Sequence, residues 1–325
     1  KLKDPTMKKF LFVLVYLISI TLSAAQDDEI LITAKINLPI YSQAQDSYCK
    51  QRDIKENVIW EEGFTNSALS KDDWSYATGN GFNHKGQYIS GWGNGELQYY
   101  RKGKGETFTN VNLFIEEGLL KIQPIFHKKG FRGFQYTSAR ILSKTKKIFT
   151  YPSKLTVCFK VPKGIGFWPA FWLMPEKEVD WPQGGEIDIL ENRGRIANVA
   201  SSALHYGKTA ANKSTLVGEA MIPKTVNFQE SFHSITFEWL EDELNFYLDN
   251  DTKPYFTVNS KLDAFNKFGY PFNSSYYLII NVAVGGIYDD YYVDSTAFCI
   301  DEECSNKEIP DNARFLIDWI EYSKL

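Results

Sequence analysis

A chain of 325 residues is long enough for one large all-β domain or two ordinary domains, and either can bury a sizeable core. Aromatic residues make up 15% of the chain, and its 19 Tyr and 8 Trp are side chains that often stack on flat ligands when they are exposed. The 36 basic and 40 acidic residues leave a formal charge of only -4, and no stretch gathers Lys and Arg, so we expect no nucleic-acid partner.

The first segment is typical of an export signal. Two lysines follow Met7, residues 10–22 are apolar, and small residues before Gln26 favour cleavage there. The alternative is a membrane anchor, but the apolar run is shorter than the roughly 20 residues that a spanning helix needs. We therefore predict a leader and signal peptide over residues 1–25, a secreted extracellular protein, and no membrane attachment after cleavage.

The cysteines all lie after the predicted cleavage site. They are Cys49, Cys158, Cys299 and Cys304. An even number in an exported chain fits two disulfides, for which three pairings exist. The local pair Cys299–Cys304 is preferred, which leaves Cys49 with Cys158, and free buried thiols are the alternative.

Beyond a polar lead-in at residues 26–56, which we expect to be poorly ordered, the pattern is that of β-strands. Apolar residues alternate over 235–239 and, after an acidic turn, over 244–248, which predicts a hairpin with one buried face. Similar runs occupy 154–161, 276–284 and 315–322. Clusters of Gly, Asn and Pro separate these runs at short intervals, as in a sandwich of two antiparallel sheets. We predict one domain over residues 57–325.

The stretch GGEIDILEN at residues 184–192 carries three acids, Glu186, Asp188 and Glu191. Side chains of a strand alternate between its faces, so Glu186 and Asp188 share a face and Glu191 points the other way. One extra residue bulged out after Asp188 corrects the parity and brings all three acids to one face. Crowded carboxylates repel each other and raise at least one pKa, which chemistry or a cation explains better than stability does. The alternative is an ordinary strand with Glu191 exposed on its outer face.

This stretch and several further blocks resemble glycoside hydrolase family 16, specifically its laminarinase-like branch of endo-β-1,3-glucanases. The blocks follow the order of the family and cover the chain from about Val58 to its end. They are GWGNGELQYY at 91–100, SARI at 138–141, FWPAFWLMP at 167–175, GEIDILE at 185–191, LHYG at 204–207, NVAVGG at 281–286 and IDWIEY at 317–322.

The resemblance implies a fold and a mechanism. The fold is all-β, a β-jelly-roll sandwich of two antiparallel sheets whose concave sheet forms a carbohydrate-binding cleft. Glu186 matches the nucleophile of the family, Glu191 its general acid/base, and Asp188 the carboxylate that assists the nucleophile. The implied reaction on β-1,3-glucan is a retaining double displacement, in which a covalent glycosyl-enzyme forms and is then hydrolysed. This catalytic chemistry requires no cofactor.

Further residues match substrate-binding positions of the family. They are Asn94, Arg140, Trp168, Trp172, Trp181 and His205. An indole face stacks well on the apolar face of a pyranose ring, and Trp168 and Trp172 share strand parity. Asn94 and Arg140 match residues that bind sugar hydroxyls on the non-reducing side of the cut, and His205 matches a histidine near the nucleophile. The alternatives are core packing for the tryptophans, a surface ion pair for Arg140 and a satisfied core histidine for His205.

A structural calcium ion is a further implication. Asp318 matches an aspartate that binds calcium in many members of the family, together with backbone oxygens. One carboxylate is weak support for a metal, and an exposed strand residue is the alternative. We expect a monomer whose partner is a polysaccharide substrate.

One departure from the family and two other functions must be weighed. After NVAVGG the family usually continues with an Asn-Trp-Pro-Gly-like turn, whereas this chain has IYDDYYVD at 287–294, which leaves the subsite preference of that rim open. A non-enzymatic β-glucan recognition protein has the same fold without the acids, all of which are present here. The other alternative is a hydrolase of mixed-linkage β-glucan or another polysaccharide. Xyloglucan enzymes and lichenases typically carry E-x-D-x-E, so the additional residue favours β-1,3 linkages.

Overall fold

The computed structural model describes residues 33–34, 49, 57–102, 111–301, 304 and 311–325. The predicted signal peptide and most of the predicted lead-in lie outside these residues. In the described part of the chain the regular structure is β-strand with short 3-10 helices, and none of its helices could span a membrane. These helices are η1 (Gly91–Gly93), η3 (Asp263–Phe265), η4 (Ile287–Asp289), η5 (Ser295–Ala297) and η6 (Asp311–Ala313).

The larger of the two main sheets has nine strands, and apart from the parallel β1–β17 pair its neighbours are antiparallel. Its order is β1 (Thr33–Ala34), β17 (Asn212–Met221), β16 (Val199–Thr209), β15 (Glu186–Glu191), β14 (Phe167–Pro175), β21 (Ser275–Val284), β11 (Arg140–Leu142) and β3 (Ser75–Ala77), with β12 (Phe149–Thr150) also pairing with β21.

The second main sheet has eight antiparallel strands. Its order is β20 (Phe256–Asn259), β19 (Glu243–Leu248), β18 (His233–Trp239), β13 (Ser153–Lys160), β23 (Phe315–Lys324), β8 (Leu119–Ile122) and β7 (Leu113–Glu116), with β2 (Val58–Glu62) pairing with β23. The hairpin predicted over 235–248 is β18–β19, in which Ile235 pairs with Leu248, and the prediction is confirmed.

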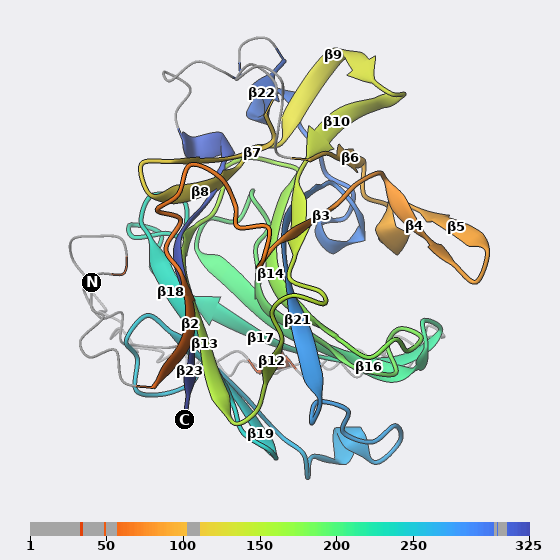
Figure 1. Ribbon diagram of the computed structural model, residues 1–325, viewed down its shortest axis with the longest axis vertical. Helices are drawn as coiled ribbons and strands as arrows, with labels where there is room; N and C mark the ends of the chain where they lie inside the picture. Colours follow the sequence, from red (N-terminus) through yellow and green to blue (C-terminus); the bar gives the residue numbers. More distant parts are fainter. Residues whose placement is uncertain (1–32, 35–48, 50–56, 103–110, 302–303, 305–310) are drawn as a thin grey trace, which may run out of the picture.

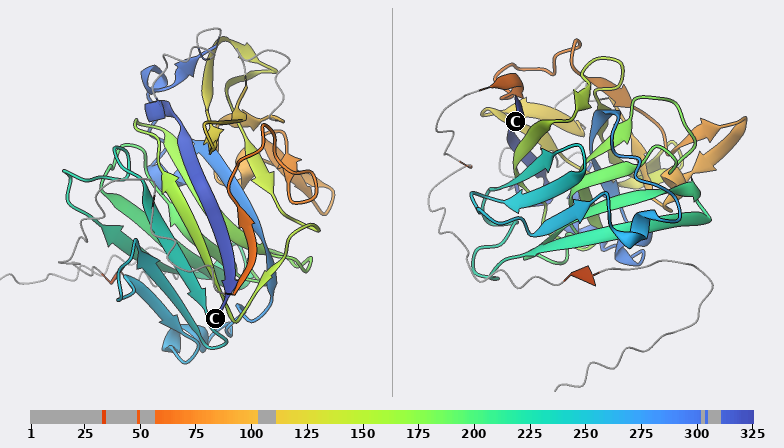
Figure 2. Two further views of the ribbon diagram at one scale, coloured as in Figure 1. Left: turned by 60° about the vertical axis from the view of Figure 1, so that its left-hand side comes forward. Right: turned by 90° about the horizontal axis from the view of Figure 1, so that it is seen from below.

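Two smaller sheets extend the body beyond the main pair, as Figure 1 shows. One has the order β22 (Cys299–Ile300), β9 (Ile125–Phe131), β10 (Phe134–Ser138) and β6 (Gln98–Tyr100), and it joins segments far apart in sequence through the parallel pairs β22–β9 and β10–β6. The other is the hairpin of β4 (Gly81–His84) and β5 (Gln87–Ser90), which projects from the side of the molecule (Figures 1 and 2).

The hydrophobic core lies between the two main sheets (Figure 2). Strand β14 shows how the sequence pattern builds it, because Phe171 and Leu173 are fully buried while Trp168 and Trp172 on the opposite face stay partly exposed. Phe171 and Leu173 belong to the same apolar cluster as Val157 of β13, on the other sheet. The predicted sandwich of two antiparallel sheets is therefore confirmed, and among the described residues the face of β14 opposite the core stays partly exposed.

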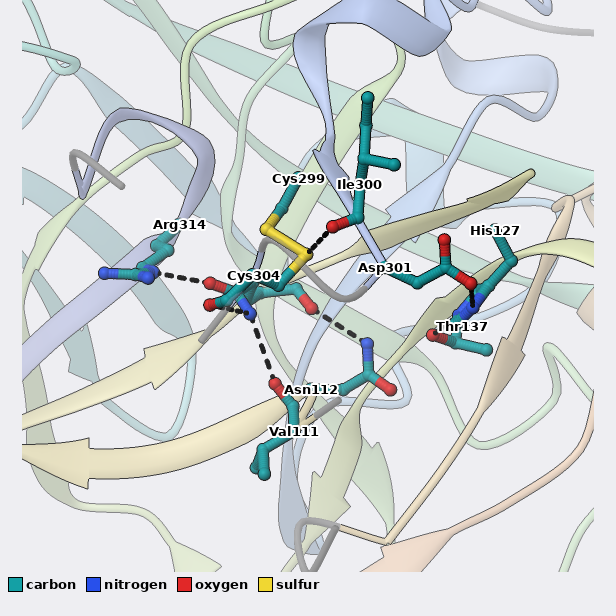
Figure 3. The surroundings of a disulfide bond; sticks show 10 residues. Val111, Asn112, His127, Thr137, Cys299, Ile300, Asp301, Cys304 and Arg314 are labelled. Atoms are coloured by element: carbon teal, nitrogen blue, oxygen red, sulfur yellow. Dashed lines mark hydrogen bonds and ion pairs between the residues drawn. A yellow bond between two sulfur atoms is a disulfide. The ribbon is translucent and has the colours of Figure 1, made fainter. Parts of the chain in front are cut away.

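Both predicted disulfides are present. Cys49 is bonded to Cys158 and Cys299 to Cys304, with Cα–Cα distances of 5.8 and 5.4 Å. Among the described cysteines none is free, so the alternative of buried thiols is wrong. Figure 3 shows the Cys299–Cys304 bridge close to Asp301, whose carboxylate contacts the ring of His127 on β9.

Candidate active site

The strand β15 carries a bulge between the second and third acids of GGEIDILEN. On β16, Asp188 pairs with Ala203 and Glu191 with Ser201, so three steps along β15 face only two along its neighbour. Both residues inside this interval, Ile189 and Leu190, are completely buried. The predicted correction of parity is confirmed, since the additional apolar residue faces the core and Glu191 returns to the face of Glu186.

Glu186 lies at the start of β15 and is held by a neighbouring loop. The indole nitrogen of Trp181 donates a hydrogen bond to its Oε2 atom over 2.9 Å. On the other side, Nε2 of His205 lies 3.9 Å from Oε1. His205 is thus next to Glu186, as predicted, and Trp181, which was predicted to stack on a sugar, contributes its polar edge to the carboxylate.

Asp188 is more deeply buried and shares the same histidine. Nε2 of His205 lies 3.2 Å from Oδ2 of Asp188. The other ring nitrogen of His205, Nδ1, lies 2.9 Å from Oγ1 of Thr215 on the next strand. The imidazole therefore lies between a hydroxyl and two carboxylates, next to Glu186 as the resemblance implies.

Glu191 ends β15 and is nine-tenths buried. The indole nitrogen of Trp168 donates a hydrogen bond to its Oε1 atom over 2.8 Å. The ring of Trp168 stacks on Tyr288 with centroids 4.9 Å apart and an interplanar angle of 19°. Because Tyr288 covers one face of this indole, Trp168 has at most its other face for a sugar.

The three acids share one electrostatic environment. Burial raises the pKa of Glu186, Asp188 and Glu191 to about 8 in each case. The negative charge of Asp188 raises the pKa of both glutamates further, whereas a positive charge on His205 lowers it. Since the loss of one proton makes the next loss harder, the cluster titrates as a unit and retains at least one proton at neutral pH.

The predicted sugar-binding residues Arg140 and Trp172 lie together on the same face. The guanidinium carbon of Arg140 lies 4.8 Å from the centre of the Trp172 ring, and the Trp172 indole nitrogen donates to Oδ1 of Asn281 over 2.8 Å. Trp172 pairs in register with Asp188 on β15, so Trp172 and the neighbouring Arg140 lie beside the acids. The alternatives of core packing for Trp172 and a surface ion pair for Arg140 do not match these contacts.

Asn94 lies in a turn after η1, and its environment includes a residue that the sequence analysis missed. The side-chain nitrogen of Asn94 donates to Oε1 of Glu96 over 3.3 Å. Glu96 is buried and also accepts hydrogen bonds from Gln98 at 2.6 Å and Tyr100 at 3.1 Å. Burial raises the pKa of Glu96 and the charge of Arg140 lowers it. Glu96 thus holds Asn94 by a hydrogen bond and is influenced by the charge of Arg140, and its place in the GWGNGELQYY block was the available signal.

A second missed residue is Tyr288, in the stretch that departs from the family. Besides covering Trp168, it shares a hydrogen bond of 2.5 Å between its hydroxyl and that of Ser201, the partner of Glu191 on β16. The guanidinium of Arg193 lies 4.1 Å from the centre of its ring. The departure therefore supplies an aromatic side chain beside Glu191.

Two places in the described chain have side chains that could bind a metal ion. Ligand atoms of Glu186, Asp188 and His205 lie within 4.8 Å of one another. The hydrogen bond from Trp181 to Glu186 shows that this group already has protein partners. Asp318 lies at a second bulge, because Cys158 pairs with Trp319 and the next residue of β13 pairs with Ile317.

Comparison with known proteins agrees with this geometry. A family model described as glycosyl hydrolases family 16 matches residues 84–301. A glucan endo-1,3-beta-glucosidase from Cryptopygus antarcticus is 32% identical over 70% of this chain and 80% of its own length. Glucan endo-1,3-beta-glucosidase A1 from Niallia circulans is also 32% identical over 72% of this chain, which spans only 34% of that relative. The crystal structure of the laminarinase catalytic domain from Thermotoga maritima superposes with a TM-score of 0.68, at 31% identity, over 82% of this chain and 98% of that one.

The family model and the relatives identify this two-sheet sandwich, with its paired glutamates on one face of a sheet, as a glycoside hydrolase. The chain belongs to glycosyl hydrolases family 16. The expected jelly-roll class is confirmed by the same structural likeness.

Crowding of the acids gives a prediction for stability. In the unfolded chain these carboxyls have pKa values near 4, so the raised pKa values in the folded protein destabilise it progressively as pH rises from about 4 to about 8. Glu186→Gln keeps an acceptor for Trp181 and removes one charge. It should raise the free energy of unfolding at pH 8 by about 2 kcal/mol, since a tenfold change in acidity is about 1.4 kcal/mol, and change it little at pH 4.

Chemical unfolding at both pH values measures this difference. Glu178→Gln is the matched control, because that side chain is 90% exposed and should give no comparable gain. A gain of equal size at pH 4 and pH 8 would show that charge crowding is not its cause.

Proposed function

We propose that this hydrolase is a secreted, retaining endo-β-1,3-glucanase. The observation that carries the proposal is the bulged strand β15, which presents Glu186 and Glu191 on one face with Asp188 between them. The substrate is supported by the relatives described above, whose names specify 1,3-β-glucan or laminarin as what they act on. Binding without catalysis is disfavoured because a receptor gains nothing from crowding three buried acids.

The first chemical step cleaves the glycosidic bond. Glu191 donates its proton to the glycosidic oxygen as the bond to the anomeric carbon breaks. A carboxylate oxygen of Glu186 attacks the same carbon from the opposite face, which gives an α-linked glycosyl-enzyme. Both glutamates accept one indole N–H and both have a pKa of about 8, so the division of roles between them rests on the likeness to the family.

The second step releases the sugar. Glu191, now ionised, takes a proton from a water molecule as that water attacks the anomeric carbon, and Glu186 leaves as a carboxylate. The product keeps the β configuration, and Glu191 ends the cycle protonated. Asp188 assists through its charge next to Glu186, and His205 assists by positioning both acids, which it contacts.

Binding of the polysaccharide is assigned to the surrounding side chains. Arg140 and Asn94 donate hydrogen bonds to sugar hydroxyls on the non-reducing side of the cut. Trp172 and Trp168 each have one ring face covered, by Arg140 and by Tyr288 respectively, and each can offer the other face to a pyranose ring.

Export and a monomeric state are also proposed. The basic and apolar leader before Gln26 and the two disulfides support secretion, since disulfides persist in oxidising compartments. N-terminal sequencing of secreted protein should begin near Gln26, and a chain that retains residues 10–22 would contradict this. Light scattering should give the mass of a single chain.

A structural calcium ion at Asp318 is proposed as well. Asp318 lies at the bulge of the β13–β23 ladder, and calcium sites commonly combine one carboxylate with backbone oxygens. Nearby, Oδ2 of Asp318 lies 3.9 Å from the sulfur of Cys158. Millimolar calcium should raise the Tm of the wild type and leave Asp318→Asn unchanged. Equal responses to calcium and to a chelator in both proteins would rule out this site.

The proposed activity is tested on four polysaccharides in parallel: laminarin, lichenan, agarose and xyloglucan. We expect laminarin to be cut internally into short oligosaccharides, with much slower turnover of agarose and xyloglucan. Chromatography of early products separates internal cutting from release of glucose alone. Faster cleavage of lichenan would indicate a mixed-linkage enzyme, and binding of laminarin without any cleavage would indicate a recognition protein.

The roles of the two glutamates give separable outcomes on an activated aryl β-glucoside. Glu191→Ala should still form the glycosyl-enzyme, because the aryl leaving group of this substrate needs little protonation. The variant should then stall, because it lacks the base that activates water. Azide should rescue turnover and yield the β-glycosyl azide. Glu186→Ala forms no intermediate, so azide in the vacated space should yield the α-azide.

On laminarin, whose leaving group is poor, each alanine variant should lose about 100-fold or more in kcat. The configuration of each azide product is determined by NMR. If both variants give the same configuration, or if Glu191→Ala cuts laminarin at the wild-type rate, the assignment of nucleophile and acid/base is wrong.

A further inference from the structure

The turn that precedes Asn94 has an unusual backbone. Gly91, Gly93 and Gly95 all have positive φ angles, of 56°, 82° and 69°, which glycine adopts without steric cost. Trp92 lies among them with φ 54° and ψ 20°, in the left-handed region that a bulky side chain rarely occupies. Three neighbouring positions of this turn are glycine, whereas the tryptophan at position 92 adopts the left-handed conformation at a steric cost.

Hydrogen bonding of the side chain does not explain the tryptophan. The indole nitrogen of Trp92 is buried and has no hydrogen-bond partner among the described residues. A buried N–H without an acceptor is unfavourable in its own right. The ring packs against Tyr100, at 5.6 Å between centroids, and against the exposed Phe82, at 6.0 Å. Neither contact requires an indole.

The contact that does depend on an electron-rich ring is with Arg140. The guanidinium carbon of Arg140 lies 4.3 Å from the centre of the Trp92 ring and 4.8 Å from that of Trp172. The guanidinium is therefore close to two indoles, an arrangement that favours a cation. Nε of Arg140 is buried and makes no hydrogen bond within the described chain, so hydrogen bonding through Nε does not orient the group.

We propose that Trp92 is a positioning residue that holds the guanidinium of Arg140 beside Trp172 and directs its edge toward the bound sugar. The inference rests on the proposed function, in which Arg140 binds hydroxyl groups of the glucan. Trp92 itself touches no reacting atom. Its effect should therefore appear in substrate affinity, and only while Arg140 is present.

A double-mutant cycle tests this dependence. Binding of a laminarin-derived hexasaccharide is measured by calorimetry for Trp92→Leu, Arg140→Ala and the double variant, all in a Glu186→Gln background that prevents hydrolysis. Trp92→Leu should weaken binding by about 5- to 30-fold, and Arg140→Ala by at least as much. The double variant should bind no more weakly than Arg140→Ala alone. Tyr88→Leu, which removes an exposed aromatic ring from β5, is the matched control and should bind like its parent.

Enzymes with Glu186 intact provide a second readout. Trp92→Leu should raise KM for laminarin by a similar factor and leave kcat within about twofold, whereas Trp92→Phe should recover most of the affinity. Site-specific incorporation of fluorinated tryptophan at position 92 weakens the ring's attraction for a cation with little change of shape. Affinity should fall with each added fluorine, and this test applies even if Trp92→Leu does not fold.

The outcomes are distinguishable. If the losses from Trp92→Leu and Arg140→Ala multiply in the double variant, or if fluorination has no effect on affinity, Trp92 is only a packing residue and this inference is wrong. If the wild type binds the hexasaccharide but does not cut laminarin, the proposed catalysis fails and the cycle still decides the role of Trp92. If the protein neither binds nor cuts β-1,3-glucan, the proposed function fails and this inference fails with it.

Discussion

The repulsion among three buried carboxylates is the constraint on which the site depends. Glu186, Asp188 and Glu191 lie on one face because a single additional residue is accommodated toward the core. Such crowding is costly, and the fold opposes it with a large apolar cluster shared by two sheets. One histidine and two indole N–H donors contact the acids locally. The same features that reduce stability keep a proton available on a carboxyl group near neutral pH.

The indole rings around these acids donate hydrogen bonds to glutamates, donate to an asparagine, and pack against a cation. Trp168 and Trp181 each donate one hydrogen bond to a glutamate, and Trp172 donates to Asn281. Arg140 lies next to Trp172 and Trp92, so ring faces also hold a cation. An aromatic ring with a polar edge can fix the position of a neighbour with few rotatable bonds, which suits a site where small displacements change reactivity.

Much of this arrangement could be predicted from the sequence. Alternation of apolar residues identified the β18–β19 hairpin, and the parity of the acids predicted the bulge at Ile189. Both signals are local, because strand periodicity is carried by neighbouring residues. The pairing of Cys299 with Cys304 followed from their short spacing.

Other features depend on contacts between distant segments and left no local pattern. The parallel pairs of β6 with β10 and of β22 with β9 are of this kind. The tryptophans were expected to stack on sugars, and their hydrogen bonds to the acids arise only when loop and strand meet in three dimensions. Tyr288 was not predicted for a different reason. It lies where the sequence departs from the family, so the resemblance assigns no role to it.

The bulge at Ile189 also bears on how such a strand can change over generations. Loss of that one codon would leave Glu186 and the final glutamate four steps apart in a regular strand, and therefore still on the same face. The gain or loss of one residue at this position thus preserves the side on which the acids lie, although it alters the distance between them along the strand. Insertions elsewhere in β15 would turn one acid into the core. At this one position, therefore, β15 can gain or lose a residue without moving an acid to the core face of the sheet.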